Sequence, residues 1–268
     1  MAVRVSFGQY YSARSPIHAL DARVKFVVTV AFMVSCFFVN SVAALALAIG
    51  VLAVATRVAR VPFLRLVAQI RPVMALLAVT SIVNLFFVHT GPVVLGAGPV
   101  QIHAGGISSA VFYTVRFSLL TLAGGLLMLT TTPTALADGT ERLLSPLERI
   151  GVPVTQTALT LSIALRFVPT ISQEMDNIVA AQTARGADLE NKGALAFARA
   201  CVPLAVPLFA SAIRHADRLG QAMDARCYTG QGRTHYHVLK LRARRDLPFA
   251  LAAAAYLAAL VALNVLGV

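Results

Sequence analysis

Two short phrases in the sequence place an arginine between two small residues. They are Ala184-Arg185-Gly186 and Ala225-Arg226-Cys227, and each follows a stretch typical of a helix. The helix dipole favours a cation at a helix C-terminus, and glycine favours the left-handed conformation that ends many helices. Lysine would serve the dipole equally well, whereas arginine offers a planar set of donors that fits a groove lined by carboxylates or carbonyls. Two interpretations therefore stay open: helix capping, and docking to another protein.

The sequence lacks the patterns that mark catalytic and cofactor sites. It has no G-x-x-x-x-G-K-[ST] loop and no dinucleotide fingerprint, so we expect no ATP hydrolysis by this chain alone. No Ser/His/Asp or His/Glu cluster has catalytic spacing, and His89 and His103 are too isolated to indicate a metal. Three scattered cysteines give neither a metal motif nor a disulfide framework. We expect no catalytic residue, no metal and no cofactor in the chain.

The composition is typical of an integral membrane protein. The chain is 58% hydrophobic and 13% charged, with a mean hydropathy of +0.76. Five apolar stretches approach the ~20 residues that cross a bilayer. They are Phe26–Val39, Val42–Thr56, Val73–His89, Ile107–Leu129 and Leu247–Leu266. The expected fold class is all-α, with about five transmembrane helices and a helical cytoplasmic module between the fourth and fifth.

The basic residues predict the orientation of these spans. All Lys and Arg residues except Arg116 precede the first span or lie in the second and fourth connections, and Asn40-Ser41 and Thr90–Gly106 carry none. The positive-inside rule then predicts a multi-pass protein of the cell (inner or cytoplasmic) membrane with its N-terminus in the cytoplasm. The net charge of +12 reflects this topology and attraction to anionic membrane lipid. We expect no nucleic-acid binding.

We divide the chain into residues 1–132, with four spans, residues 133–246, a cytoplasmic module, and residues 247–268, the last span. Two stretches of the module are nearly apolar enough to be spans themselves: Val154–Thr170 and Ala194–Ile213. Arg166 and Arg199 would then lie in the membrane, at about 2.5–3.5 kcal/mol each. Pro203 and Pro207 are also expected to break the second stretch into short pieces. We favour helices at or below the inner face, and seven spans are the alternative.

Four polar residues are assigned structural roles: Asp21, Arg23, Arg116 and Arg166. Asp21 and Arg23 are expected to anchor the N-terminal segment at the membrane surface. Arg116 in the fourth span is costly unless it is paired. It either contacts Asp21, Glu174 or a backbone carbonyl, or extends its side chain to the interface.

Several phrases, in order along the chain, resemble the transmembrane component of energy-coupling factor transporters, a family related to the cobalt-transport Q protein. The opening, made of Gly8-Gln9-Tyr10 and the run from Ser15 to Lys25, is similar to the family's start, where a phrase Leu-Asp-Pro-Arg-x-Lys leads into the first span, and Ala22 replaces the proline. The other similar phrases are Leu129–Pro133, Ser162–Pro169, Gln182–Gly186, Ala222–Tyr228 and Gly232-Arg233-Thr234. The chain departs from the family at Cys227, where glycine is usual and tolerates a positive φ better.

The resemblance implies an energy-coupling subunit of an importer for vitamins or other micronutrients. Its two Ala-Arg tips would dock into two ATP-binding cassette subunits, which would bind the ATP and Mg. The apolar surface of the module would hold a separate substrate-binding membrane protein, the S component. For that surface we name Leu195, Phe197, Pro203, Leu204, Pro207 and Leu208.

Three alternatives remain within and beyond this family. The chain is either shared among several S components or dedicated to one, as in a cobalt, nickel or biotin importer. Its length and its Leu-Asp-x-Arg opening are more similar to the shared type. A stand-alone permease is the poorer alternative, because the spans offer only Arg116, Asn84 and a few hydroxyls as a polar path.

Overall fold

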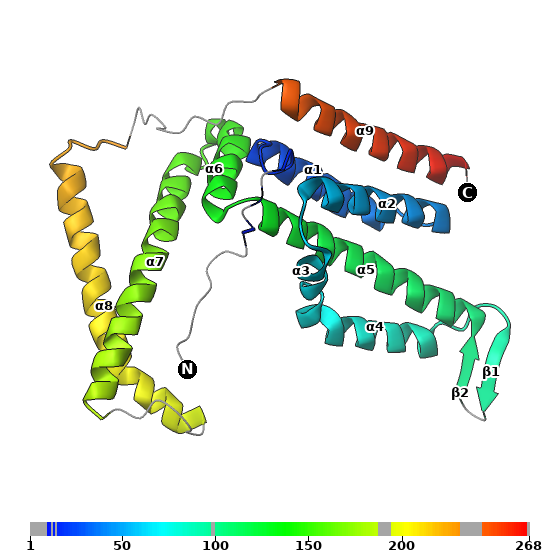
Figure 1. The fold of residues 1–268 in the computed structure, drawn as a ribbon, viewed down its shortest axis with the longest axis horizontal. Coiled ribbons are helices and arrows are strands. Elements are labelled where there is room, and N and C mark those ends of the chain that lie inside the picture. The colour runs from blue at the N-terminus through cyan, green and yellow to red at the C-terminus, as the bar shows by residue number, and fades with distance from the viewer. Residues whose placement is uncertain are drawn as a thin grey trace. The chain divides into compact units, whose positions relative to one another are not determined.

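The protein is helical throughout most of its length (Figure 1). The computed structural model describes residues 10–11, 13, 15–97, 100–186, 194–230 and 243–266. These residues form two compact units, which we call the helix bundle (Gly8–Thr140 with Leu239–Val268) and the helical module (mainly Glu141–Val238). The module expected from the sequence, residues 133–246, begins and ends slightly outside the second unit.

The helix bundle contains most of the elements. They are α1 (Ala22–Phe37), α2 (Val42–Ala59), α3 (Phe63–Ala68), η1 (Arg71–Val73), α4 (Met74–Phe87), β1 (Val93–Ala97), β2 (Val100–His103), α5 (Ala104–Thr130) and α9 (Ala243–Leu266). α6 (Pro133–Leu144) begins in the bundle. The module contains η2 (Ser145–Ile150), α7 (Val154–Ala184) and α8 (Ala194–Asp224).

Side-chain caps fix where the first helices begin. The Asp21 carboxylate accepts from the Arg23 backbone N–H at 2.9 Å, at the start of α1. The Ser41 hydroxyl accepts from the Ala44 N–H at 3.1 Å, at the start of α2. Each cap satisfies one of the N–H groups that the first helical turn leaves without a partner, which typically stabilises a helix by ~1 kcal/mol. The two-residue break Asn40-Ser41 therefore separates two helices, as expected.

The bundle is built around α5, which packs against α1, α2, α3 and α4, while α9 packs against α1 and α2. Ala44 and Ala48 of α2 are fully buried, so small side chains let this helix approach its neighbours closely. Gly106 of α5 has the same role against α4, because an added Cβ would lie 2.8 Å from the Leu85 carbonyl oxygen. The buried core also includes Cys36, Val39 and Leu119.

Five helical segments of the described residues are long and apolar enough to cross a membrane: Val42–Ala59, Phe63–Phe87, Ala104–Thr130, Val154–Ala184 and Arg245–Val265. The chain is thus an all-α, multi-pass membrane protein, as the sequence predicts. The membership differs from our five stretches, however. α1, which holds the expected first span, has only 16 residues. α7, which we expected at the membrane face, qualifies by length and composition.

One short sheet interrupts the helices. β1 and β2 pair antiparallel between α4 and α5, with Val93 opposite His103 and Ala97 opposite Val100. We expected only a connection at Thr90–Gly106. The β-branched and aliphatic residues that begin β1 favour a strand, but a pair this short is visible in a sequence only as weak alternation.

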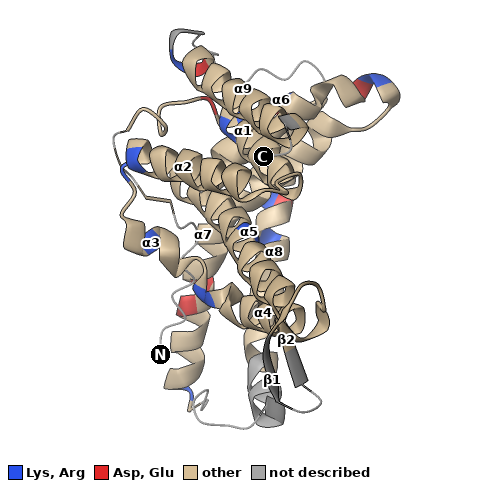
Figure 2. Cartoon of the chain, turned by 90° about the vertical axis from the view of Figure 1, so that its right-hand side faces the viewer, with Lys and Arg blue, Asp and Glu red and all other residues tan. Residues whose placement is uncertain are grey.

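Charged residues lie mainly at the ends of the bundle's helices (Figure 2). α4 contains no charged residue, and α2 contains only Arg57, in its last turn. The end of α2 and the starts of α1 and α9 lie at one end of the bundle, and the hairpin lies at the other (Figure 1). This arrangement agrees with the one-sided distribution of Lys and Arg in the sequence.

Candidate functional site

The helical module is a pair of long helices that cross near their middles. α7 and α8 each have 31 residues. At the crossing the Ser211 hydroxyl of α8 donates to the Glu174 carboxylate of α7, and only 3% of Ser211 is exposed. Phe167 and His215 add an edge-to-face ring contact, with centroids 5.8 Å apart. The hydrogen bond and the ring contact together hold α7 against α8.

The crossing makes α7 and α8 antiparallel, and this separates their C-terminal ends. From Phe167 to Glu174 the chain of α7 advances, while its partners on α8 go back from His215 to Ser211. The two helices therefore extend in opposite directions beyond the crossing, as Figure 1 shows. Arg185 lies 11 residues beyond Glu174, and Arg226 lies 15 residues beyond Ser211, which is about 26 residues of helix in all. At 1.5 Å per residue the two tips are up to roughly 40 Å apart.

The first tip closes α7. Arg185 is the C-cap of the helix, and Gly186 follows with a left-handed φ of +86°. The Gly186 N–H donates to the Thr183 carbonyl at 2.9 Å, and the Arg185 N–H to the Gln182 carbonyl at 3.1 Å. Ala184, Arg185 and Gly186 are all exposed. The guanidinium is thus carried by a helix end whose neighbours are too small to cover it.

The second tip closes α8 in the same way. Cys227 takes the left-handed position with φ of +51°. Its N–H donates to the Asp224 carbonyl at 2.9 Å, and the Tyr228 N–H donates to the Met223 carbonyl at 3.1 Å. These two bonds are the pair that defines a Schellman cap. Arg226 precedes the left-handed residue, as Arg185 does at the first tip, and both Arg226 and Cys227 are exposed.

The repeated phrase in the sequence is therefore a repeated backbone structure, with alanine, arginine and a left-handed residue in the same three cap positions. Cys227 does not change this geometry, although it is an unusual residue for a positive φ. A non-glycine residue in that conformation costs roughly 1–2 kcal/mol. Capping and docking are not exclusive, because the cap fixes the backbone and leaves the guanidinium exposed.

The expectation that Pro203 and Pro207 break the stretch Ala194–Ile213 into short pieces is wrong. α7 runs through Pro169, and α8 runs through both Pro203 and Pro207. A proline inside a helix removes one N–H bond and bends the helix, but packing on a neighbour can keep the helix continuous. α8 bends in its first half in Figure 1, the half that holds both prolines. The prolines therefore shape α8 without ending it.

The side chains that α8 exposes differ from those we named for the coupling surface. Leu204 is buried, Pro207 and Leu208 are half-buried, and Pro203 is exposed. Leu195 and Phe197 belong to α8, but their side chains lie outside the described part of the chain. The open side of the helix instead carries four large apolar residues, which we call the apolar face of α8: Val202 (60% exposed), Val206 (66%), Phe209 (70%) and Ile213 (60%).

Helical spacing explains the apolar face. Its four residues follow one another at intervals of four, three and four, so they share one side of α8. Leu204, Leu208 and Ser211 lie on the other side, toward α7. The helical spacing of these apolar residues was visible in the sequence. The side of α8 that packs on α7 was not, because it depends on the contact between Ser211 and Glu174.

Of the four structural polar residues, three lie in the bundle. Asp21 is buried, and its backbone N–H donates to the Asp246 carboxylate of α9 at 3.2 Å. Arg23 lies 3.7 Å from the Asp21 carboxylate. These contacts connect the segment before α1 to the start of α9. Arg166 is exposed on α7.

Arg116 contacts a backbone carbonyl, which is one of the three partners we considered. Its guanidinium donates to the Val39 carbonyl and lies over the Phe112 ring at 4.8 Å and the Tyr113 ring at 5.5 Å. It therefore links α5 to the turn after α1, inside the bundle. Glu174 is bonded to Ser211 instead.

Comparison with known proteins shows the family. The cobalt transport protein family (CbiQ) matches residues 13–236. The energy-coupling factor transporter transmembrane protein EcfT of Thermosediminibacter oceani is 39% identical over 239 residues, which cover 88% of this chain and 89% of that protein. The protein of the same name from Bacillus subtilis is 39% identical over 237 residues, covering 87% and 88%. The chain belongs to the transmembrane (T) component family of energy-coupling factor transporters.

This T component also resembles a protein with a different name. A putative ABC transporter ATP-binding protein of Bifidobacterium longum is 44% identical over 252 residues, which cover 94% of this chain. They cover only 32% of that protein, so the T component spans about a third of its length. The family match from residue 13 to residue 236 includes both arginine tips and the crossing between α7 and α8.

Proposed function

We propose that this T component docks two ATP-binding cassette subunits with Arg185 and Arg226 and transmits their movement to a substrate-binding S component. The observation that carries this proposal is the repetition of one cap geometry at the two far ends of a crossed helix pair. Two equal tips suit two similar partners. The Bifidobacterium relative supports the pairing, since it is named as an ATP-binding protein and 32% of its length matches this chain.

The chemistry of the tips favours a carboxylate- or carbonyl-lined groove as their partner. Each guanidinium can donate two parallel hydrogen bonds to one carboxylate. When such a pair is buried in an interface, removing one partner costs about 2–5 kcal/mol, much of it from the charge left unpaired. The small residues beside each arginine let the helix end enter a narrow groove.

The apolar face of α8 is the surface that we assign to the S component or to the lipid around it. Four large apolar side chains on one exposed side of a helix would aggregate in water unless a membrane or a partner covers them. Val202, Val206 and Phe209 lie before Ser211, and Ile213 lies at the crossing itself, whereas Arg226 lies beyond it. Movement of the tip would therefore move the first three of these side chains in the opposite direction.

Two narrower questions belong to the same proposal. We propose a cell-membrane location with a cytoplasmic N-terminus, supported by the basic residues at one end of the bundle.

A stand-alone permease is less favoured, because hydroxyls inside the bundle bond to neighbouring groups: Ser35 contacts the Tyr256 hydroxyl at 2.9 Å, and Thr130 bonds to the Leu126 carbonyl at 2.8 Å.

The test is affinity purification of Arg185→Glu and Arg226→Glu variants from the native membrane, with identification of the proteins that accompany each. We expect both variants to lose ATP-binding cassette subunits and to keep small membrane proteins. Arg218→Glu is the matched control, because Arg218 is an exposed arginine of α8 away from the tip. Full recovery of the ATPases with both tip variants would refute docking by these residues. Recovery of a single S component would indicate a dedicated T component, and recovery of several would indicate a shared one.

A further inference from the structure

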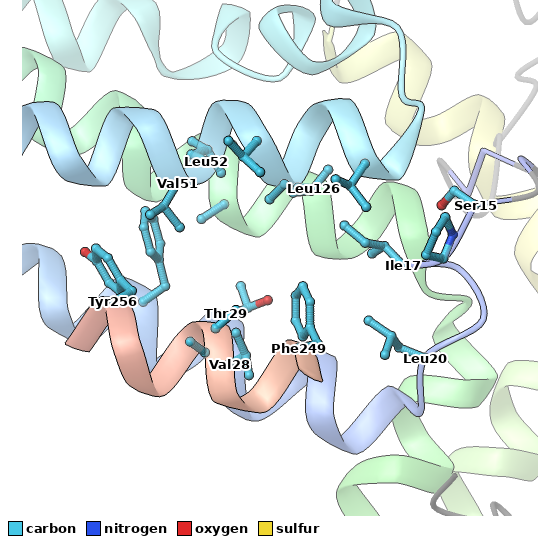
Figure 3. Close-up of a pocket in the computed structure, with 18 of the residues that line it drawn as sticks. Ser15, Ile17, Leu20, Val28, Thr29, Val51, Leu52, Leu126, Phe249 and Tyr256 are labelled. Carbon is cyan, nitrogen blue, oxygen red and sulfur yellow. The ribbon is translucent and has the colours of Figure 1, made fainter. Parts of the chain in front are cut away.

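A large apolar cavity opens inside the helix bundle. Its volume is about 1380 Å³, and it lies among α1, α2, α9 and the segment before α1, with α5 behind them (Figure 3). Val51, Leu126 and Phe249 are typical of its lining. Pockets for drug-sized ligands usually measure about 300–1,000 Å³, so this cavity suits a larger apolar occupant.

The cavity has the length of one membrane leaflet. Along α9 its lining extends from Arg245 to Leu257, and along α2 from Ala46 to Val58. Twelve residues of helix rise about 18 Å. Half of a hydrocarbon core of about 30 Å is roughly 15 Å. An acyl chain from one leaflet would therefore reach from one end of the cavity to the other.

The charged residues of the lining are all cations and lie at one end. They are Arg60, which caps the C-terminus of α2, and Arg245, in the first turn of α9, and both are exposed. These two helix ends lie at the same end of the bundle (Figure 1). Among the described residues that line the cavity, none is Asp or Glu. Asp246, next to Arg245, is buried and accepts from the Asp21 N–H.

We propose that this cavity binds one anionic phospholipid, with its phosphate at Arg60 and Arg245 and its acyl chains along α2 and α9. Arginine matches the geometry of phosphate and is less strongly hydrated than lysine. Anionic lipids are enriched in the cytoplasmic leaflet, where juxtamembrane cations attract them. A purely apolar occupant, such as a partner's helix, would not use the two arginines at this end of the cavity. The lipid would hold α9 against α1 and α2, independently of the docking tips.

The chain offers a sensitive test because it contains no tryptophan. Phe249→Trp places a single fluorophore in the cavity, and Leu257→Trp places a second reporter farther along α9. Leu251→Trp is the matched control, since Leu251 is 60% exposed on α9 and does not line the cavity. Each full-length variant is reconstituted in phosphatidylcholine vesicles that contain a small fraction of brominated phosphatidylglycerol or brominated phosphatidylcholine, and quenching is measured.

We expect brominated phosphatidylglycerol to quench the two cavity reporters with an apparent preference of roughly 25-fold over phosphatidylcholine, from two juxtamembrane arginines at about five-fold each. Adding the double change Arg60→Gln and Arg245→Gln to each reporter should abolish this preference. Leu251→Trp should be quenched about equally by both lipids, with or without the double change. Equal quenching by both lipids at both cavity reporters would overturn the proposal. A second result would also overturn it: in the assembled transporter, brominated lipid quenches Leu251→Trp but neither cavity reporter. A partner protein, and not a lipid, would then fill the cavity.

Discussion

Replacing Arg226 by lysine separates docking from helix capping more sharply than removing the charge. Lysine keeps the positive charge at the end of α8 and has nearly the same helix propensity as arginine. It does not keep the planar guanidinium, which can donate two hydrogen bonds to one carboxylate. A residue that only caps the helix would tolerate this change, whereas a residue that enters a partner's groove would not.

The two effects differ in magnitude. Arg226 is exposed in the chain, and a cation at a helix C-terminus contributes about 0.3–1 kcal/mol, most of which lysine retains. The free energy of unfolding should therefore change by less than about 0.5 kcal/mol. In a complex, loss of one hydrogen bond between charged groups costs about 1.5–3 kcal/mol. The affinity for the ATPase subunits should then fall roughly 10- to 150-fold.

The assay measures binding of the purified T component to its ATPase pair in detergent, together with thermal unfolding of each variant. Arg218→Lys, farther back on α8, is the control and should change neither quantity. Arg226→Ala sets the scale for loss of the whole side chain. If Arg226→Lys binds like the wild type while Arg226→Ala loses binding, charge alone suffices and the bidentate groove is refuted.

Three further changes test the local structure of the module. Cys227→Gly should raise the free energy of unfolding by about 1 kcal/mol, because glycine adopts the left-handed cap position without strain, and chemical denaturation measures it. Ser211→Ala should cost about 1.5–3 kcal/mol by removing a hydrogen bond to a carboxylate, whereas Ser172→Ala, which removes only a bond to its own helix, should cost far less. Hydrogen bonds from Thr155 lower the pKa of Glu148, so its stabilising contribution is complete above the unfolded pKa of about 4.3 and disappears as the pH falls through the lower folded value. Glu148→Gln should therefore be less stable than the wild type at neutral pH and equal to it in sufficiently strong acid.

The sequence was sufficient to predict the long helices of the bundle, although not α3, and the positions of the two tips. Hydropathy and length mark the spans, and the small residue after each arginine marks the cap. The left-handed φ at Cys227 was predictable as well, since it occupies the position of Gly186 in the repeated phrase. Both signals are local, so neither depends on tertiary contacts.

The features that the sequence did not reveal depend on contacts between elements. Pro203 and Pro207 should disrupt an isolated helix, yet α8 remains continuous. The apolar face of α8 could be defined only after the bond between Ser211 and Glu174 showed which side packs on α7. Local propensity is a weak guide in both places because tertiary packing overrides it.

A helix end can transmit force only if the helix behind it is held. α7 is held near its start, where the Glu148 carboxylate accepts from the Thr155 backbone N–H at 2.9 Å. It is held again at the crossing, where Glu174 accepts from Ser211. The stretch of α8 between Ser211 and Arg226 contains no proline, whereas both prolines of α8 lie on the other side of the crossing. We infer that the tip and its stretch of α8 move as a stiff lever about the crossing, and that any bending occurs beside the apolar face.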